Sequence, residues 1–418
     1  MMQSSGKLTL ALLASSLALA YGIWYAYSVM LVALLDEFSW DRSVLAGAFS
    51  LFAIVHGFTN PVIGHLCDRV RPGLIMIVGG IALGCALFAN ATIESPLHLY
   101  LYFGGLTSVS VAMCGWAPAV VQVHHRFQHR LGFALGIVSS GIGVGMLVLV
   151  PLCQFLIESY GWRPAFRALG MICGGFIVPA AIYLFVTDPA RAKKKAQPAD
   201  TSDADRAGDI SLRQAARQSP FWLMVLAFFF GSTCSQTLHV HQVAFLVDHG
   251  IAALTAAAVV GVVGVASVFG KTGGGWISDR IDREVVYVSG IMIMVASVAA
   301  ITIAGHRASV TWAYLYATML GVGYSATAAI IPAMVSDRFQ GRHFGTILGM
   351  GLFSSAAGSA LGPWMGGYLF DLTGSYHLPF SIAAVFGVGA GLAGWLMRRA
   401  RLSAIANAGP GASGGIGR

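Results

Sequence analysis

Long runs of apolar residues joined by short polar links dominate the chain. Each run has about 20 residues or more, which is the length that an α-helix needs to cross a bilayer. The pattern predicts an all-α integral membrane protein with twelve transmembrane helices. The expected spans are roughly 8–35, 43–67, 73–93, 97–124, 131–158, 164–186, 219–248, 252–277, 284–304, 309–335, 344–371 and 377–398.

The longest polar stretch, Asp188 to Gln218, lies between the sixth and seventh spans. It is too charged and too poor in large apolar residues to fold alone. It therefore divides the chain into two halves of six spans. We expect one half over residues 1–187, a cytoplasmic linker over 188–218, the second half over 219–402 and a disordered Gly-rich tail over 403–418.

Composition agrees with the membrane assignment. The chain is 56% hydrophobic and only 10% charged, whereas soluble domains are about 25% charged. The first run, Leu8 to Leu35, carries no charge and is too long for a removed signal peptide, so it is expected to stay as a span. The six cysteines lie in or beside apolar runs without close spacing, and we expect them to pack rather than form disulfides or bind metal.

The distribution of positive charge predicts the orientation. With both termini inside, twenty Lys and Arg residues fall on the cytoplasmic side and four fall outside, namely Arg42, Arg163, Arg167 and Arg307. The positive-inside rule selects this topology, in the inner (plasma) membrane. The net charge of +8 thereby faces cytoplasm and anionic lipid, so that a nucleic-acid partner is not needed to explain it.

The two halves repeat in sequence. A Gly-x-x-x-Asp-Arg segment follows the second span and another follows the eighth, 211 residues later. Arg130 and Arg342 precede the fifth and eleventh spans at an offset of 212 residues. Repeats of this size in the same orientation are typical of transporters built from two six-helix halves. The paired segments contain Gly64, Asp68, Arg69, Gly275, Asp279 and Arg280.

With these loop segments, the chain resembles the major facilitator superfamily over nearly its whole length. The resemblance implies the fold of that family and a transport function. The paired loops correspond to the family's loop motif, in which glycines permit close helix packing. The Asp and Arg residues are expected to bond to a neighbouring helix and latch the inner gate, not to bind substrate.

Within the superfamily, the chain is similar to the monocarboxylate porter and oxalate–formate antiporter group. Three features carry this similarity: the link SVMLVALLDEFSWDRSVLAGAFSL, the segment Phe127 to Gly136, and Lys271, eight residues before the loop Asp, where the group has a substrate-binding arginine. Two positions differ from the monocarboxylate porters: Ser267 replaces an Asp, and Tyr27 falls where they have a lysine. The proton-relay pair of that group is therefore missing.

Lys271 is the candidate with the strongest physical case. It lies roughly 12 Å into the membrane from Asp279 along a helix, and an ammonium at that depth costs about 3 kcal/mol. The alternatives are a side chain that snorkels to the headgroups or one paired structurally with a neighbouring helix. Ser267 shares its face one turn earlier. The repeat maps this pair onto His56 and Asn60 in the other half.

Other polar groups in the spans are weaker candidates. His239 could bind an anion or carry a proton, because its ordinary pKa is near physiological pH, although a helical histidine is more often a packing residue. His241, two positions later, lies on another face of the helix. The aromatic residues Tyr25, Tyr27 and Tyr324 could line a cavity, with packing or interface roles as the alternative.

These features favour a secondary active transporter of small organic anions, foremost monocarboxylates such as lactate or pyruvate. Alternating access with proton symport or anion exchange is expected. A dicarboxylate or other organic-anion antiporter, a metabolite exporter and a non-transporting membrane sensor stay open. No carboxylate lies deep in a span, which disfavours carriers of organic cations. The glycines near Lys271 do not form a nucleotide-binding loop, and we expect no enzyme activity, cofactor or metal.

Overall fold

The computed structural model describes residues 2–127, 131–187, 212–278, 280–339 and 344–407, in which helices are the only regular secondary structure. The predicted tail beyond residue 407 and most of the predicted linker lie outside these residues, as do Arg130, Asp279 and Arg342. The first half contains α1 (Met2–Phe38), α2 (Arg42–Arg69), α3 (Pro72–Asn90), α4 (Pro96–Leu99), the π-helix η1 (Tyr100–Thr107), α5 (Ser108–Cys114), α6 (Trp116–Arg126), α7 (Leu131–Tyr160) and α8 (Trp162–Val186).

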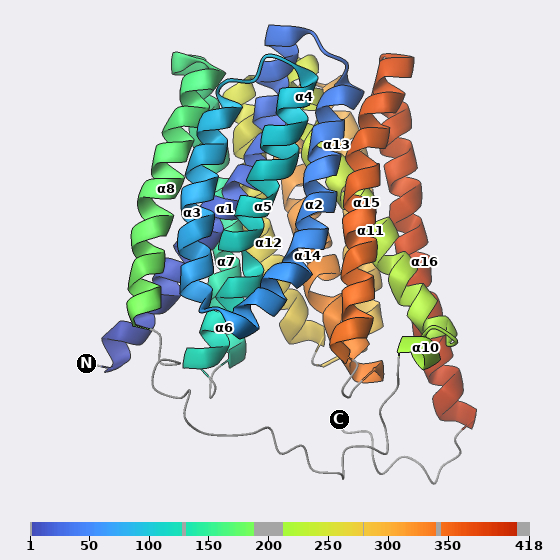
Figure 1. The fold of residues 1–418 in the computed structure, drawn as a ribbon. Helices are drawn as coiled ribbons and strands as arrows, with labels where there is room; N and C mark the ends of the chain where they lie inside the picture. The colour runs from blue at the N-terminus through green and yellow to red at the C-terminus, as the bar shows by residue number, and fades with distance from the viewer. Residues whose placement is uncertain (1, 128–130, 188–211, 279, 340–343, 408–418) are drawn as a thin grey trace.

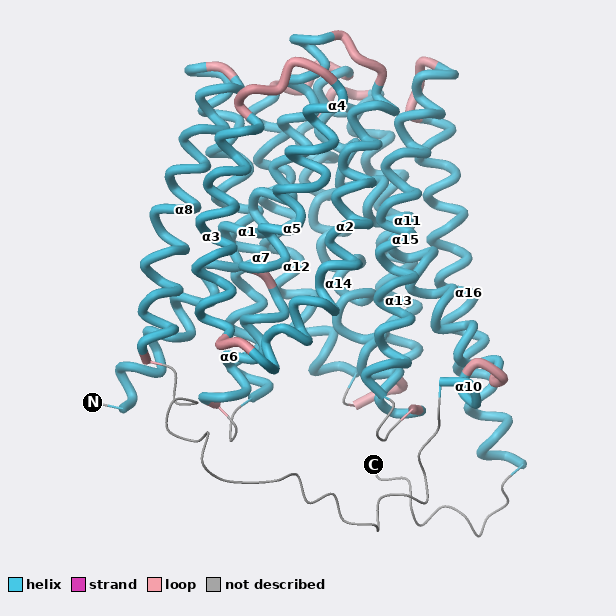
Figure 2. Tube along the Cα trace, viewed as in Figure 1, coloured by secondary structure: helices cyan, strands magenta, loops and turns pink. Residues whose placement is uncertain are grey.

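The second half repeats the pattern of long helices. It contains α10 (Leu212–Ala215), α11 (Ser219–Asp248), α12 (Ala253–Ser278), α13 (Arg283–His306), α14 (Val310–Arg338), α15 (Phe344–Thr373) and α16 (His377–Asn407). The helices stand side by side in one bundle (Figures 1 and 2). The start of α1 and the end of α16 lie at the same end of the bundle, which we call the inner end because the sequence predicts it to be cytoplasmic. The opposite end is the outer end.

Glycines end several of the long helices. Gly161 after α7, Gly250 after α11 and Gly374 after α15 have φ values of 85°, 82° and 66°. Residues with a Cβ atom rarely adopt this left-handed conformation, so that glycine is the residue best suited to stop a helix and reverse the chain there. The helix ends predicted from the apolar runs lie within a few residues of these stops.

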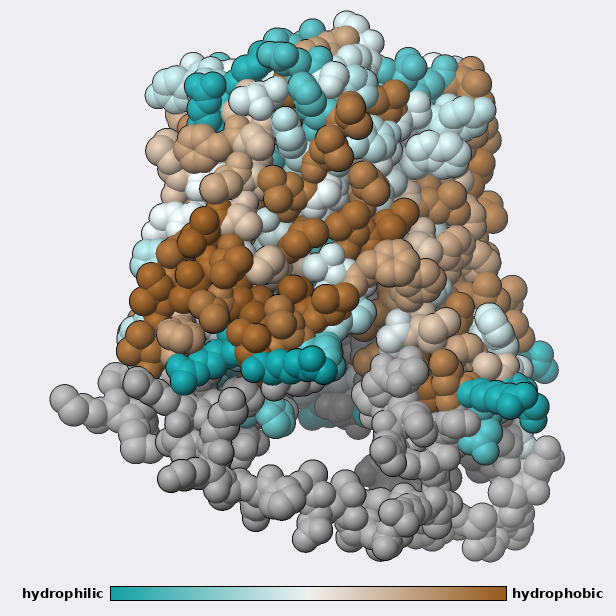
Figure 3. All heavy atoms as spheres, viewed as in Figure 1, coloured by the Kyte–Doolittle hydropathy of each residue, from teal (hydrophilic) through white to brown (hydrophobic). Residues whose placement is uncertain are grey.

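The lateral surface of the bundle is apolar. Large side chains such as Met171, Phe269 and Val385 are more than half exposed. On the face shown in Figure 3, hydrophobic residues cover the middle of the bundle and hydrophilic residues gather at both ends. Ten of the described helical stretches are long and apolar enough to span a bilayer. Membrane lipid is the solvent that suits such a surface. The ten stretches do not include α14 and α15, so that the predicted spans over 309–335 and 344–371 stay predictions.

The fourth predicted span is a broken helix in the structure. The sequence predicts one helix over 97–124, but the chain passes through η1 and α5 and bends at Gly115, whose φ and ψ are −88° and −146°. Pro118 has no N–H to continue the hydrogen-bond ladder across this point. Thr107 donates a hydrogen bond to the carbonyl of Tyr102 and accepts one from Asn90, which stabilises the π-helical turn. The hydrophobic pattern does not record such side-chain bonds.

Contacts between the halves run from the outer end to the middle of the bundle. The helices α2 and α15 pack against each other, as do α7 and α12, and α1 and α11. In the middle, a Cβ atom at Gly143 of α7 would lie 2.5 Å from the carbonyl oxygen of Gly264 in α12, so that only glycine permits this approach. Near the outer end, Ser50 donates a hydrogen bond to the carbonyl of Ala360.

At the inner end, the polar clusters described in the structure stay within one half. Asp282, just before α13, accepts hydrogen bonds from Arg398 at 2.9 Å and Arg401 at 2.6 Å, and Arg401 also bonds to Glu284. In the other half, Arg126 bonds to Thr9 and to the carbonyl of Leu184. Among the described residues, a polar network around Arg42 joins the two halves at the outer end. The conformation is therefore closed on the outer side.

The Asp282 cluster predicts a pH-dependent contribution to stability. Hydrogen bonds from Arg401 and Arg398 lower the pKa of the Asp282 carboxyl. Its contribution is therefore complete above the unfolded-state pKa of about 4 and is lost as the pH falls through the lower folded-state pKa. We expect Asp282→Asn to reduce stability at pH 7 by about 1 kcal/mol, measured as the thermal unfolding midpoint of purified protein. The difference from the wild type should shrink on acidification, and Glu94→Gln at an exposed loop acid is the matched control; equal midpoints at pH 7 would contradict the prediction.

Candidate functional site

Lys271 lies on α12, seven residues before the helix ends at Ser278. At 1.5 Å rise per residue this places it roughly 10 Å from the inner end of that helix. Its side chain is partly buried, and its Nζ atom donates a hydrogen bond to the hydroxyl of Tyr324 at 3.4 Å. The same ammonium lies 5.4 Å from the centre of the Tyr324 ring. In the part of the chain that the structure describes, no carboxylate forms an ion pair with Lys271.

A row of aromatic rings leads from Lys271 to the other half of the protein. The ring of Tyr324, on α14, meets the ring of His239, on α11, edge to face at a centroid distance of 5.0 Å. On its other side, His239 lies 5.3 Å from the ring of Tyr25, on α1. Tyr324 is only 8% exposed and His239 only 2%. Side chains from α1, α11, α12 and α14 therefore meet at one place between the halves.

The hydroxyl of Tyr324 is the common partner in this cluster. It accepts the hydrogen bond from Lys271 and lies near the hydroxyl groups of Tyr25 and Ser267. Ser267 is fully buried and donates a hydrogen bond to the carbonyl of Gly264 at 2.8 Å. We call Lys271, Ser267, Tyr324, His239 and Tyr25 the lysine cluster. It combines one cation with several hydroxyl groups and one imidazole, a set that suits a small anion with further polar groups.

His56 and Asn60, the counterparts of Ser267 and Lys271 in the repeat, form a neighbouring group in the first half. The His56 ring lies 4.9 Å from Trp24 and 6.1 Å from Tyr21, both edge to face. Asn60 donates a hydrogen bond to the carbonyl of His56 at 3.0 Å. Trp24 in turn lies 6.5 Å from Tyr25. His56 is thus joined to the lysine cluster through aromatic rings, while no direct contact of His56 or Asn60 with Lys271 is recorded among the described residues.

Tyr27 is not brought to the lysine cluster. Its hydroxyl donates a hydrogen bond to the carbonyl of Leu45 at 2.6 Å, and its ring stacks on Phe103 at 4.2 Å. It is 1% exposed. Tyr27 follows Tyr25 by two positions in α1, so its side chain lies on another face of the helix. It packs in the interior of the first half.

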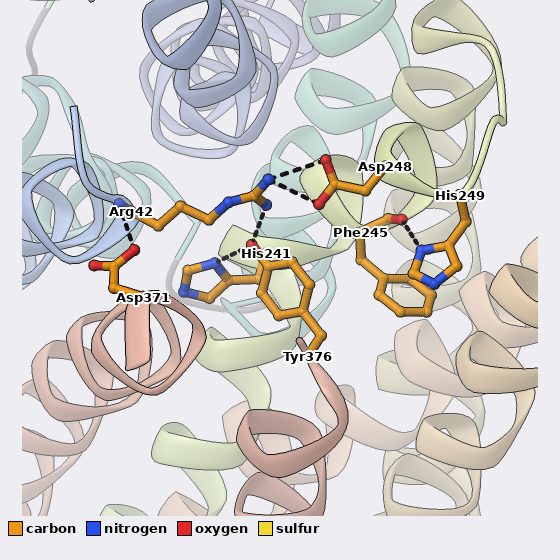
Figure 4. Close-up of polar contacts among 7 residues, drawn as sticks. All are labelled: Arg42, His241, Phe245, Asp248, His249, Asp371 and Tyr376. Carbon is orange, nitrogen blue, oxygen red and sulfur yellow. Dashed lines mark hydrogen bonds and ion pairs between the residues drawn. The ribbon is translucent and has the colours of Figure 1, made fainter. Parts of the chain in front are cut away.

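A polar network at the outer end joins the two halves (Figure 4). The guanidinium of Arg42, at the start of α2, pairs with Asp248 at 2.8 Å and donates a hydrogen bond to the hydroxyl of Tyr376 at 2.7 Å. Asp371 accepts hydrogen bonds from the backbone N–H groups of Arg42 and Ser43 at 2.9 and 2.8 Å. Because Arg42 belongs to the first half and its partners to the second, these bonds hold the outer ends together.

His241 completes this outer network. Its Nε2 atom lies 2.8 Å from the carbonyl of Pro363, and its Nδ1 atom lies 3.1 Å from the Tyr376 hydroxyl. A carbonyl only accepts, so Nε2 carries the hydrogen and Nδ1 of the neutral ring accepts from Tyr376. The sequence places Arg42 and Asp248 near the outer surface, but no pattern in it indicates that they meet. They are 206 positions apart.

Comparison with known proteins decides the family. The sequence profile of the Major Facilitator Superfamily matches residues 13–350 and 243–415. The chain belongs to the Major Facilitator Superfamily. Among curated proteins, this superfamily member is 26% identical to monocarboxylate transporter 13 of Rattus norvegicus, covering 88% of this chain and 83% of the relative. It is also 26% identical to monocarboxylate transporter 12-B of Danio rerio, covering 85% and 79%.

Bacterial members are similar as well. An uncharacterized MFS-type transporter of Bacillus subtilis (strain 168) is 23% identical, covering 86% of this chain and 87% of the relative. Among solved structures, a bacterial homolog of the human lysosomal transporter Spinster, inward-facing and unoccupied, aligns with a TM-score of 0.75 at 18% identity, covering 96% of this chain and 98% of that one. This similarity establishes that the chain has the MFS fold.

The loop motif of the superfamily is only partly described here. The Asp68 side chain and the whole of Asp279 lie outside the described residues. Arg280 folds back onto its own helix, donating a hydrogen bond to the carbonyl of Trp276 at 2.8 Å and lying 3.5 Å from the centre of that ring. Arg69 is exposed. The inner latch expected of this motif stays a prediction.

The packing role expected of the two motif glycines stays a prediction. Added Cβ atoms at Gly64 and Gly275 would meet no described atom within 4 Å. Close packing is seen at glycines inside the spans: at Gly141 and Gly145 of α7, a Cβ atom would collide with the carbonyl oxygens of Ala14 and Ala18 in α1.

Proposed function

We propose that this protein is a secondary transporter of small organic monoanions, foremost monocarboxylates of the lactate and pyruvate type. The supporting observation is the partly buried Lys271, whose recorded hydrogen-bond partner is a neutral hydroxyl. The curated monocarboxylate transporters that the chain resembles point to the same class of substrate. Bound at Lys271, a carboxylate would replace the missing counter-charge.

This arrangement gives a physical basis for alternating access. A lone ammonium is costly to enclose in a low-dielectric layer, and so is a lone carboxylate. Together they form a neutral pair that a closing cavity can surround at lower cost. The lysine cluster draws side chains from both halves, so that binding there can favour their movement against each other. The outer end is closed in this structure, and the substrate would leave or enter from the inner side.

The single cation favours a monoanion over the other substrate classes. A dicarboxylate would bring a second negative charge, for which the lysine cluster contains no second fixed cation. The alternatives, which this charge argument disfavours for a dicarboxylate, are a dicarboxylate or other organic-anion antiporter and a metabolite exporter. Either proton symport or anion exchange is compatible with the cluster, which lacks a carboxylate among its described members.

Counterflow in proteoliposomes tests the proposal. Vesicles loaded with one unlabelled anion are supplied with one labelled compound outside, and uptake is compared for 2-oxopropanoate, 2-hydroxypropanoate, butanedioate and an organic cation. We expect both monocarboxylates to exchange, with butanedioate at least about tenfold slower, because its second charge is uncompensated. Faster exchange of the dicarboxylate would favour the antiporter alternative. Absence of flux with every anion would favour a membrane sensor and reject the proposal.

A further inference from the structure

His239 is the one member of the lysine cluster with a buried polar atom that no described residue satisfies. Its ring is 2% exposed and lies between Tyr25 and Tyr324. Its Nδ1 atom lies 2.7 Å from the carbonyl oxygen of Ser235, one turn earlier in α11. Its Nε2 atom, on the far side of the ring, is buried without a hydrogen-bond partner among the described residues. A buried polar atom left unpaired costs free energy, so a partner is expected.

The bond to Ser235 fixes the tautomer of the neutral ring. A backbone carbonyl has no hydrogen to give, so the short contact requires the hydrogen to be on Nδ1 of His239. In the neutral imidazole the other nitrogen then has a free lone pair and acts as an acceptor. The buried Nε2 atom therefore needs a ligand group that donates a hydrogen bond, which a carboxylate oxygen does not do.

Lys271 and His239 share a neighbour, the side chain of Tyr324, next to which one small ligand would reach both. Both lie against the Tyr324 side chain, with the ammonium 5.4 Å and the imidazole 5.0 Å from the centre of its ring. The ammonium donates and the imidazole Nε2 accepts. A ligand that satisfies both would have a carboxylate at one end and a neutral donor next to it.

We propose that His239 Nε2 accepts a hydrogen bond from a hydroxyl group on C2 of the bound monocarboxylate, so that the site prefers 2-hydroxy over 2-oxo monocarboxylates. The inference rests on the function proposed above and specifies its substrate class. A 2-oxo group would place a second acceptor against the Nε2 lone pair. An unsubstituted acid would leave Nε2 unpaired. A 2-ammonium group would add a positive charge beside Lys271 in a cluster whose described members include no carboxylate.

Ligand affinities of the purified full-length protein test this preference. Dissociation constants are measured at one pH for 2-hydroxypropanoate, 2-oxopropanoate and propanoate, through calorimetry or ligand-dependent thermal stability. One net hydrogen bond corresponds to about fivefold in affinity. We expect 2-hydroxypropanoate to bind about fivefold or more tightly than the other two acids. We expect His239→Leu to remove this ratio by weakening the binding of 2-hydroxypropanoate, while all three acids still bind through Lys271.

Two further variants separate a role in selectivity from a role in folding. His239→Gln offers an amide oxygen in place of Nε2 and should keep part of the ratio. His249→Leu is the matched control, because His249 directly follows the last residue of the same helix and its Nδ1 is bonded in the same way to the carbonyl of Phe245 at 2.8 Å, but at the outer end (Figure 4). It should keep the full ratio.

The possible outcomes distinguish this inference from the proposed function. Equal affinities for the 2-hydroxy and 2-oxo acids in the wild type would overturn the inference, as would a ratio unchanged in His239→Leu or a preference for the 2-oxo acid. In each of these cases the carboxylates still bind, and the proposed function stands. Binding of none of the three acids, or binding indifferent to the charge at Lys271, would instead reject the proposed function.

Discussion

Replacing Lys271 with glutamine is expected to lower carboxylate uptake by at least about a hundredfold. The substitution keeps a polar side chain of similar length and removes only the charge. A carboxylate bound without a counter-charge in a dry site is disfavoured by about 3 kcal/mol or more, and each 1.4 kcal/mol corresponds to a factor of ten. The measurement is initial uptake of labelled monocarboxylate into proteoliposomes containing equal amounts of each variant.

Two variants control for this result. Lys271→Arg keeps the charge and should retain most of the transport, with some loss because the guanidinium is larger and planar. Lys7→Gln makes the same chemical change at an exposed lysine near the start of α1 and should have no effect. Transport by Lys271→Gln at the wild-type rate would show that the ammonium is structural and would remove the main argument for an anion carrier.

Replacing Arg42 with glutamine is expected to shift the protein toward an outward-open conformation. Arg42 pairs with Asp248 and bonds to Tyr376, and its guanidinium carbon lies 4.0 Å from the centre of the Phe370 ring. The Arg42 side chain is 13% exposed and that of Asp248 is 34% exposed, so the guanidinium is the more shielded partner. Losing the charge-assisted bonds should change the ratio of closed to open outer ends by about tenfold or more.

The shift can be measured as a distance between the outer loops of the two halves. Spin labels at Thr92→Cys and Arg307→Cys, in a background without the exposed Cys85, report this distance in lipid nanodiscs. Arg42→Gln should increase the population at longer distance, and Arg42→Lys should do so less. Arg163→Gln is the matched control, because it breaks a 2.8 Å ion pair with Glu37 that lies within the first half. Identical distance distributions for Arg42→Gln and the wild type would show that the network does not hold the outer end closed.

Much of the site's chemistry could be predicted from local sequence. Lys271 stands out because a charge within an apolar run is costly wherever the helix is placed, and the repeat then draws attention to His56 and Asn60. The same reasoning treats Tyr25 and Tyr27 alike, since both are aromatic residues in the first span. Only the packing separates them: Tyr25 meets His239 across the halves, while Tyr27 is bonded to Leu45 within one half.

The outer network could not be predicted from local sequence patterns. Arg42, Asp248, Asp371 and Tyr376 come from three separate helix ends and a loop, and each one by itself reads as an ordinary residue at a membrane boundary. Their meeting depends on how the halves close, which no periodicity records. The unpaired Nε2 of His239 is of the same kind, because it depends on which nitrogen the Ser235 carbonyl engages.

The sequence by itself determined the membrane class, the approximate positions of most of the long helices and the presence of a costly cation in the eighth span. It could do so because each of these follows from transfer free energies and repeat spacing along a single helix. The tertiary structure alone decided which polar groups share a site, which glycines make close contacts and which end of the bundle is closed. Those outcomes depend on distances between helices that are far apart in the chain, and such distances are set by the packing of whole helices against one another.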